Sequence, residues 1–424
     1  MNPPRVLVVS HNVFSTGNNM GRSLAALLSS WDPASLSQLY FYPEEPQLPL
    51  CRRYFRMTDG EVLHALWTRR PGGKPMSLGC ASPSSCLRPL YRLGHNCRSA
   101  LPGLLRDAMW ALAPWHSQAL AAWIEEIQPD VLLFAPGESV FSHRVAFQLA
   151  KDYGLPVVAI CYDGIYTPPG GSPLRQLHYR LRLRWARRLM AGSTCLLTAS
   201  RPMSEAYAPL FSIPCRELYT PHQLPPQVHT APAGIRYFGN LGLGRWRQLV
   251  AIGRALRTLA LPGFPVVEVY SQEENPHILS HFTRENGLRF CGSIPGSHVT
   301  ERIAASFLVI HTESFVPRDA RQVSLSLSTK LADSLAFAPC ILAYGPASVA
   351  SIRYLLEEDA ACVATSEASL PQTLLEALTQ KSRRANCRNN ARRLAAQNHS
   401  PQSSGALLTD VLTEAAGAGG RRPL

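Results

Sequence analysis

Short β-branched segments alternate with longer amphipathic ones along almost the whole chain, and this alternation constrains the fold more than any other feature. It is typical of βαβ units, in which helices join parallel strands. The alternation predicts strands at Val6–Ser10, Asp130–Ala135, Pro156–Tyr162, Cys195–Ala199, Ile235–Gly239, Val266–Ser271, Leu288–Cys291, Phe307–His311, Ile341–Tyr344 and Ala360–Ala364. We therefore predict an α/β protein with two doubly wound parallel-sheet domains that face each other across a cleft.

The alternation fails in two places, which divide the chain. Residues 43–102 hold paired glycines and many prolines, so we predict a loop-rich insertion there with one strand at Val62–Trp67. The segment TPHQLPPQVHTAP, residues 220–232, has the proline content of a linker. A length of 424 residues also fits two domains of about 100–200 residues each. We predict an N-terminal domain at 1–220, a linker at 221–232, a C-terminal domain at 233–400 and a C-terminal segment at 401–424 with a disordered tail.

The chain is basic, with 42 Lys and Arg against 29 Asp and Glu, and only four of the cations are lysines. A nucleic-acid binder would carry a basic stripe interleaved with aromatic residues, and the nearest candidate is residues 175–188. As a helix, this segment would place Leu177, Leu181 and Trp185 on one apolar face, with arginines on the others. Such a helix suits an anionic membrane surface or a lipid-linked acceptor. It equally suits a core-facing stripe with solvated arginines, and we expect no nucleic acid partner.

The eleven cysteines form no CxxC pair and follow no regular spacing, so the sequence predicts neither a metal cluster nor a disulfide framework. Free thiols within apolar runs indicate a reducing compartment. No window reaches 18 apolar residues, and the apolar run near the N-terminus is too short for a signal peptide. We expect a cytoplasmic protein.

Ligands of doubly wound sheets bind beyond the carboxyl ends of the strands, so residues that follow strands are the candidates. After the first strand, a turn with His11, Gly17 and Asn18 leads into a helix. The free backbone N–H groups of such a turn can bind an anion or a sugar hydroxyl, but the segment can equally be an ordinary tight turn. Asp163 follows a later strand and either orients an acceptor hydroxyl or belongs to an Asp-Gly turn.

In the second half, Gly239, Asn240 and Gly244 precede a helix that starts near Arg245. Glycines that allow a ligand to approach the backbone, a helix N-terminus and an arginine guanidinium together could bind a diphosphate. The alternative is that Arg245 is a solvated arginine in a loop. Glu313 directly follows a buried strand, where a carboxylate needs a partner. Farther along, a helix begins with residues that also suit an anionic ligand: Ser328, Thr329, Lys330 and Asp333.

These residues resemble those of the GT-B glycosyltransferases, specifically the large group 1, family 4-like set of retaining enzymes that use nucleotide sugars. The bacterial members associated with capsule or other surface polysaccharide synthesis are the most similar. In the second half of the chain, the resemblance lies in FGNL at 238–241 with Arg245, FCGSI at 290–294, ESF at 313–315, STK at 328–330 and AFAPCILA at 336–343. In the first half it is weaker and lies in SHNVFSTGNNMG at 10–21 and ASRPMSEAY at 199–207. It covers most of the chain outside residues 43–102 and implies two Rossmann-like domains.

The family carries a paired acidic motif, E-x7-E, whose first glutamate lies by the donor sugar and whose second binds the nucleotide ribose. Glu313 matches the first; the position eight residues later is Arg321, and Asp333 falls in the place of the second after a longer loop. The family's arginine and lysine hold the donor diphosphate. Arg245 matches the arginine, and Lys330 would supply the lysine's charge.

The resemblance thus implies that Arg245, Lys330 and Glu313 are catalytic and that the remaining second-half candidates bind a nucleotide-sugar donor. The first-half candidates would face a saccharide or lipid-linked acceptor, at the inner face of the cytoplasmic membrane if the acceptor is lipid-linked. No DxD motif is present, and we expect neither a metal nor a cofactor. Two alternatives stay open: a nucleotide-sugar 2-epimerase of the same fold, which would need no acceptor, and a non-catalytic binding or assembly component.

Overall fold

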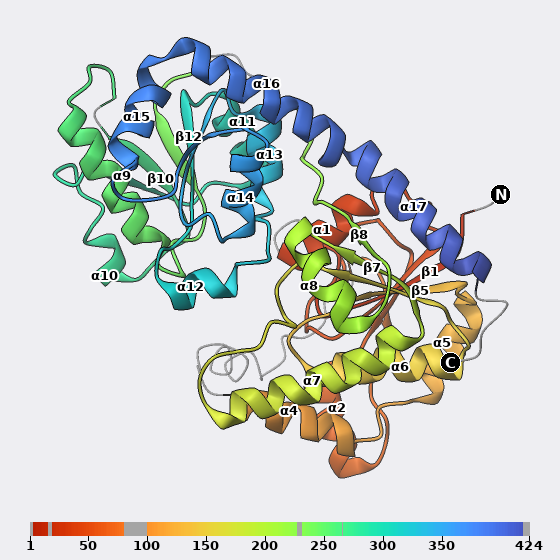
Figure 1. Cartoon of the computed structure of the whole chain (residues 1–424). Helices are drawn as coiled ribbons and strands as arrows, with labels where there is room; N and C mark the ends of the chain where they lie inside the picture. Colours follow the sequence, from red (N-terminus) through yellow and green to blue (C-terminus); the bar gives the residue numbers. More distant parts are fainter. Residues whose placement is uncertain (1–2, 16–18, 80–99, 227–230, 265, 419–424) are drawn as a thin grey trace. The chain divides into compact units, whose positions relative to one another are not determined.

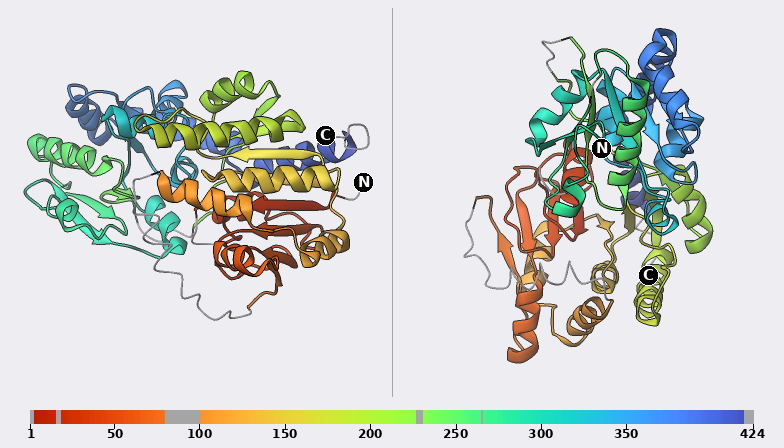
Figure 2. Two further views of the ribbon diagram at one scale, coloured as in Figure 1. Left: turned by 90° about the horizontal axis from the view of Figure 1, so that it is seen from below. Right: turned by 90° about the vertical axis from the view of Figure 1, so that its left-hand side faces the viewer.

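The computed structural model of this protein describes residues 3–15, 19–79, 100–226, 231–264 and 266–418. The chain folds into two compact units, the first comprising residues 1–199, 203–218 and 405–424 and the second residues 200–202 and 219–404. Each unit contains one sheet with helices packed against it (Figures 1 and 2). The predicted α/β architecture with two parallel-sheet domains is therefore confirmed.

The first unit has an eight-stranded sheet in the order β4-β3-β2-β1-β5-β6-β7-β8. All neighbouring strands are parallel except β3 and β4. The strands are β1 Val6–Ser10, β2 Leu36–Tyr40, β3 Arg53–Arg56, β4 Lys74–Met76, β5 Val131–Ala135, β6 Val157–Cys161, β7 Ser193–Thr198 and β8 Cys215–Glu217. The helices are α1 Asn19–Leu27, α2 Asp59–Thr68, α4 Leu101–Leu112, α5 Gln118–Ile127, α6 Val140–Asp152, α7 Pro173–Ala191, α8 Arg201–Phe211 and α17 Pro401–Ala418. The first two residues of α8 and the first four of α17 belong to the second unit, and the rest of both helices belongs to this one.

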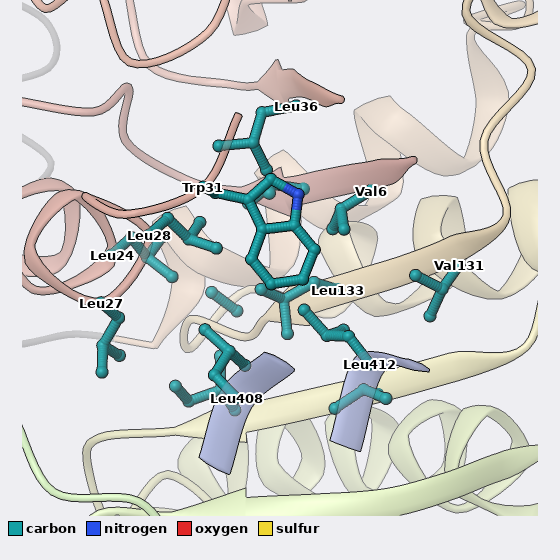
Figure 3. Packing of buried hydrophobic residues seen from close by; sticks show 14 of the residues in the cluster. Val6, Leu24, Leu27, Leu28, Trp31, Leu36, Val131, Leu133, Leu408 and Leu412 are labelled. Carbon is teal, nitrogen blue, oxygen red and sulfur yellow. The ribbon is translucent and has the colours of Figure 1, made fainter. Parts of the chain in front are cut away.

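The central strands of this sheet are covered on both faces, because every residue of β1, β2, β5 and β6 is buried. On one face, leucines of α1 and α17 pack against alternate residues of β1 and β5, as shown by the cluster around Trp31 (Figure 3). On the other face, Phe134 of β5 contacts His143 of α6, and Phe55 of β3 contacts Trp123 of α5.

One expectation for this unit was wrong. Residues 62–67 are not a strand but lie in α2, which begins with a capping box: the Thr58 side chain accepts from Glu61 N, and the Glu61 carboxylate accepts from Thr58 N. Residues 401–418 of the predicted C-terminal segment form α17, and residues 419–424 lie outside the described residues. Leu408 and Leu412 of α17 are buried against the first sheet, and this burial orders the helix (Figure 3).

The second unit has a six-stranded, wholly parallel sheet in the order β11-β10-β9-β12-β13-β14. The strands are β9 Ile235–Phe238, β10 Val267–Tyr270, β11 Leu288–Gly292, β12 Leu308–Thr312, β13 Ile341–Tyr344 and β14 Cys362–Ala364. The helices are α9 Arg245–Leu259, α10 Pro276–Leu279, α11 Gly296–Ala304, α12 Pro317–Gln322, α13 Lys330–Phe337, α14 Ala350–Glu357, α15 Leu370–Thr379 and α16 Lys381–Asn398. One hydrophobic cluster joins α9 and α15 to the sheet, and another joins α11, α13, α14 and α16 to it.

Candidate active site

The order of the second sheet reverses between β9 and β12. From β9 the chain continues to β10 and β11 on one side, and it then crosses to β12 on the other side. Ligands of doubly wound sheets bind beyond the carboxyl ends of the strands at such a switch point. The residues that follow β9 and β12 therefore lie at the edge of the sheet where a ligand would bind.

Gly244 ends the turn between β9 and α9 and brings that turn close to the loop after β12. Its φ is 72°, in the left-handed region, and a Cβ atom there would lie 2.7 Å from Ser314 Oγ and 2.9 Å from Asp319 Oδ2. Only glycine fits this conformation and this contact without strain. The N-terminus of the 15-residue helix α9 is thereby fixed beside the end of β12.

Asn240 and Gly239 shape the start of the same turn. The Asn240 Oδ1 atom accepts a hydrogen bond from Gly242 N at 2.5 Å, and its carbonyl accepts one from the Tyr237 hydroxyl at 2.8 Å. A Cβ atom on Gly239 would lie 2.6 Å from that hydroxyl oxygen. The hydrogen bonds of Asn240 thus fix the conformation of the turn through contacts within the protein.

Arg245, the first residue of α9, forms a two-pronged ion pair with Glu313. Its Nε atom lies 2.9 Å from Glu313 Oε2 and its Nη2 atom 3.2 Å from Glu313 Oε1. The side chains are 18% and 4% exposed, respectively, so the pair is largely removed from water. A cation in the first turn of a helix opposes the helix dipole, and the Glu313 carboxylate offsets this cost.

Burial raises the pKa of the Glu313 carboxyl, while the charge and the hydrogen bonds of Arg245 act in the opposite direction. Burial also lowers the pKa of His311 to about 3, and the positive charge of Arg245 adds to this effect. At neutral pH the His311 ring is therefore uncharged. The site combines one fixed cation, one buried carboxyl and one neutral imidazole.

His311 and Ser351 also belong to this cluster, although neither is among the site residues predicted from the sequence. His311 Nε2 lies 2.9 Å from Ser351 Oγ and 3.8 Å from Glu313 Oε1. The Ser351 hydroxyl also hydrogen-bonds to Glu313, which lowers the carboxyl pKa. One signal was available: His311 stands two residues before Glu313, and residues two apart in an extended chain point to the same face.

Ser328, Thr329 and Lys330 lie at the start of α13, as the sequence predicted. Thr329 is the N-cap residue and Lys330 the first residue of the helix, and all three residues are half-buried. The Ser328 carbonyl accepts a hydrogen bond from Leu331 N at 2.9 Å. The structure thus presents a lysine at a second helix N-terminus of this unit.

Asp333 lies in the first turn of α13 and is only 2% exposed. Its Oδ1 atom accepts a hydrogen bond from Gln223 N at 2.8 Å. This bond ties the segment that enters the second unit to α13. A ribose hydroxyl would have to share the carboxylate with that backbone donor.

Of the first-unit candidates, His11 and Asp163 lie within the described residues, whereas Gly17 and Asn18 lie outside them. The His11 carbonyl accepts hydrogen bonds from the backbone N–H groups of Phe41 and Tyr42. Asp163 is exposed and follows β6. Both residues lie at the carboxyl edge of the first sheet, with β5 between their strands.

Over the part of the chain that the structure describes, no group of three or more His, Cys, Asp or Glu side chains is arranged to hold a metal ion. The same residues contain no helix with the length and apolar character needed to span a bilayer.

Comparison with solved structures finds similar folds along nearly the whole chain. The structure of HepE from Anabaena in complex with UDP has a TM-score of 0.64 and 13% identity, covering 97% of this chain and 100% of that one. A UDP-forming α,α-trehalose-phosphate synthase from Burkholderia vietnamiensis has a TM-score of 0.60 and 9% identity, covering 98% of each chain. Sucrose-phosphate synthase from Thermosynechococcus elongatus has a TM-score of 0.59 and 10% identity, covering 97% of this chain and 99% of that one.

No protein-family model matches the chain, and no curated protein matches it in sequence. At 9–13% identity the likeness to these structures is one of fold. The chain therefore has the GT-B glycosyltransferase fold that the sequence resemblance implied.

Proposed function

We propose that this protein is a glycosyltransferase that moves a sugar from a nucleotide-diphosphate sugar to a saccharide or lipid-linked acceptor. The observation that carries the proposal is the buried Arg245–Glu313 pair at the switch point of the second sheet. It joins a fixed cation and a carboxyl at the edge where doubly wound sheets bind ligands. The fold shared with glycosyltransferases supports the same conclusion.

When the bond between sugar and diphosphate breaks, negative charge develops on the leaving diphosphate. Arg245 gives two of its five N–H donors to Glu313, and the guanidinium has others to offer phosphate oxygens. The N-terminus of α9 adds a partial positive charge, and Lys330 at the N-terminus of α13 adds a full one. Fixed donors of this kind stabilise a transition state without reorganisation.

In this proposal Glu313 accepts a hydrogen bond from the donor sugar while it orients Arg245. Gly239, Asn240 and Gly244 keep the turn close to the diphosphate. The residues that start α13 complete the nucleotide site, namely Ser328, Thr329 and Asp333. The acceptor binds against the first unit, near His11, Gly17, Asn18 and Asp163.

We further propose transfer of a hexose with retention and without a metal, in surface or capsular polysaccharide synthesis. The site of action would be the cytoplasm, at the inner face of the membrane when the acceptor is lipid-linked. UDP-sugars are the donors to test first, because HepE was crystallised with UDP and with UDP-glucose.

A thermal-shift screen against UDP, GDP, ADP and CMP tests the donor site, because a ligand that binds only the folded state raises the melting temperature. We expect one nucleotide to stabilise the wild type and to stabilise Arg245→Ala much less. Arg254→Ala is the matched control, since Arg254 is an exposed arginine of the same helix. Equal stabilisation of both variants would remove Arg245 from the site.

A turnover assay with the stabilising sugar nucleotide, with and without acceptor, tests the reaction. Release of nucleoside diphosphate and labelled product only with acceptor supports transfer, and the anomeric configuration of the product tests retention. Conversion of the sugar nucleotide without acceptor would instead identify a 2-epimerase. Nucleotide binding without any turnover would favour a non-catalytic component.

A further inference from the structure

Helix α4 presents a continuous apolar stripe to solvent. Leu101, Leu105 and Leu112 are 48%, 62% and 69% exposed, and Ala108 between them is exposed as well. The spacing of four, three and four residues places all four on one face of the helix. The opposite face packs into the unit through Trp110, which is 1% exposed.

Helix α2 packs beside α4 (Figure 1) and also exposes large apolar side chains. Asp59 at the start of α2 accepts hydrogen bonds from Arg106 Nε and Trp110 Nε1 of α4. Leu63 and Trp67 of α2 are 40% and 82% exposed. We call the exposed apolar residues of the two helices the α2–α4 surface: Leu63, Trp67, Leu101, Leu105, Ala108 and Leu112.

Helix α7 adds positive charge next to this surface. It is joined to α4 by His178, whose Nε2 lies 2.8 Å from Asp107 Oδ2. It contains six arginines and no acidic residue, and four of the arginines are exposed: Arg180, Arg184, Arg187 and Arg188. The apolar face that the sequence predicted for this helix is not the buried one, since Leu177 is 47% exposed while Arg182 is buried and donates to two backbone carbonyls.

The acidic side chains of α2 and α4 are held by partners inside the unit. Asp59 pairs with Arg106, and Glu61 caps its own helix at Thr58. Asp107 accepts from two backbone N–H groups at the start of α6 as well as from His178. The three neighbouring helices thus expose leucine, tryptophan and arginine side chains, and none of their carboxylates is exposed.

We propose that the α2–α4 surface, with the arginines of α7, docks onto the anionic surface of a lipid bilayer. Leucines on one helix face insert between lipids, tryptophan favours the interface between water and hydrocarbon, and arginines bind anionic headgroups. A second copy of the chain is disfavoured as the occupant, because a symmetric dimer would bring the arginines of both copies together. The inference goes beyond the proposed function by naming the docking surface, and its test needs no sugar donor.

Flotation of the full chain with phosphatidylcholine vesicles, with and without phosphatidylglycerol, tests the proposal. We expect the wild type to float with the anionic vesicles and to dissociate as salt rises. The double variant L105D/L112D should lose at least ten-fold in vesicle-bound fraction. Leu356→Asp is the control, because Leu356 is likewise an exposed leucine of a helix, at 47%, but lies on α14 of the second unit.

A second variant, Trp67→Ser, changes a side chain that is 82% exposed and does not disturb the core. We expect it to float less than the wild type and to lose fluorescence quenching by brominated lipids. Failure of the wild type to float, or flotation of L105D/L112D at the wild-type level, would overturn the proposal. So would a wild-type dimer in sedimentation that the double variant abolishes, since a second copy would then occupy the surface. If the chain transfers sugar but does not float with vesicles, the membrane-docking proposal is wrong and the proposed function still stands.

Discussion

The Arg245 Nε atom lies 2.9 Å from Glu313 Oε2, although 68 residues separate the two in the chain. They meet because β9 and β12 are neighbours in the sheet and each residue follows one of these strands. Glu313 is the anion that allows an arginine to begin α9. Arg245 is the cation that allows a carboxylate to be buried, so each residue depends on the other.

This dependence predicts strongly non-additive effects on stability. Arg245→Met and Glu313→Met should each lower the free energy of unfolding by about 3–5 kcal/mol, because each leaves an uncompensated buried charge. The double variant should lose clearly less than the sum of the two. Urea denaturation of the four proteins measures this coupling, and purely additive losses would argue against an isolated buried pair.

The neutral state of His311 predicts a pH dependence of stability. Its pKa is about 3 in the folded protein and 6.5 in the unfolded chain, so between these values only the unfolded state takes up the proton. The contribution of His311 to the free energy of unfolding is therefore fully present above pH 6.5 and is lost as the pH falls toward 3. We expect His311→Gln to reduce the slope of unfolding free energy against pH by up to about 1.4 kcal/mol per pH unit in that window.

Urea denaturation at several pH values measures the slope, and an unchanged slope would contradict a buried neutral His311. Two other histidines keep part of the slope in the variant, since burial lowers the pKa of His143 to about 3 and of His399 to about 4. Glu313 acts in the opposite direction: its pKa is raised, so its contribution is present at low pH and is lost as the pH rises above 4.5.

Gly244→Ala should be more damaging than the same change at another glycine with positive φ. Gly263 has a φ of 86° and open space around its Cβ position, so Gly263→Ala reports the backbone cost alone, about 1–2 kcal/mol. Gly244→Ala adds the clash with Ser314 Oγ and Asp319 Oδ2 and should exceed this value. Thermal unfolding with and without nucleotide checks both stability and ligand binding, and equal losses for the two variants would exclude a tight turn at Gly244.

Lys330→Ala should lower kcat for sugar transfer by about 10²–10³-fold, the usual cost of losing one fixed donor to the transition state. Lys381→Ala is the control, because Lys381 is also the first residue of a helix but is exposed. Steady-state kinetics with saturating donor make the comparison. Wild-type kcat in Lys330→Ala would exclude Lys330 from catalysis.

Leu412→Ala should lower the free energy of unfolding of the first unit by about 2–5 kcal/mol, because Leu412 is 0% exposed and its truncation leaves a cavity against the sheet. Leu224→Ala is the control: that side chain is 82% exposed and its loss should cost less than about 0.5 kcal/mol. Denaturation curves of the two variants test whether α17 belongs to the first unit, and equal curves would contradict its docking.

Several parts of the fold were predictable from the sequence for identifiable reasons. Parallel strands buried on both faces are continuous apolar runs, so β1, β5 and β13 stood out. Helix α2 was missed because its exposed Leu63 and Trp67 gave it the apolar content of a strand, although its Thr58 and Glu61 capping box was a helix signal.

The sequence by itself determined which residues follow the strands of the second sheet, because a glycine turn or a carboxylate after an apolar run is a local feature. Arg245, Glu313 and Lys330 were found in this way. Only the tertiary structure decided which of them meet: β9 and β12 become neighbours through a long-range crossover, and this pairing joins Arg245 to Glu313 and brings His311 and Ser351 beside them. Burial, which sets the charge of His311 and orders α17, depends on the same packing of distant segments and cannot be read from local patterns.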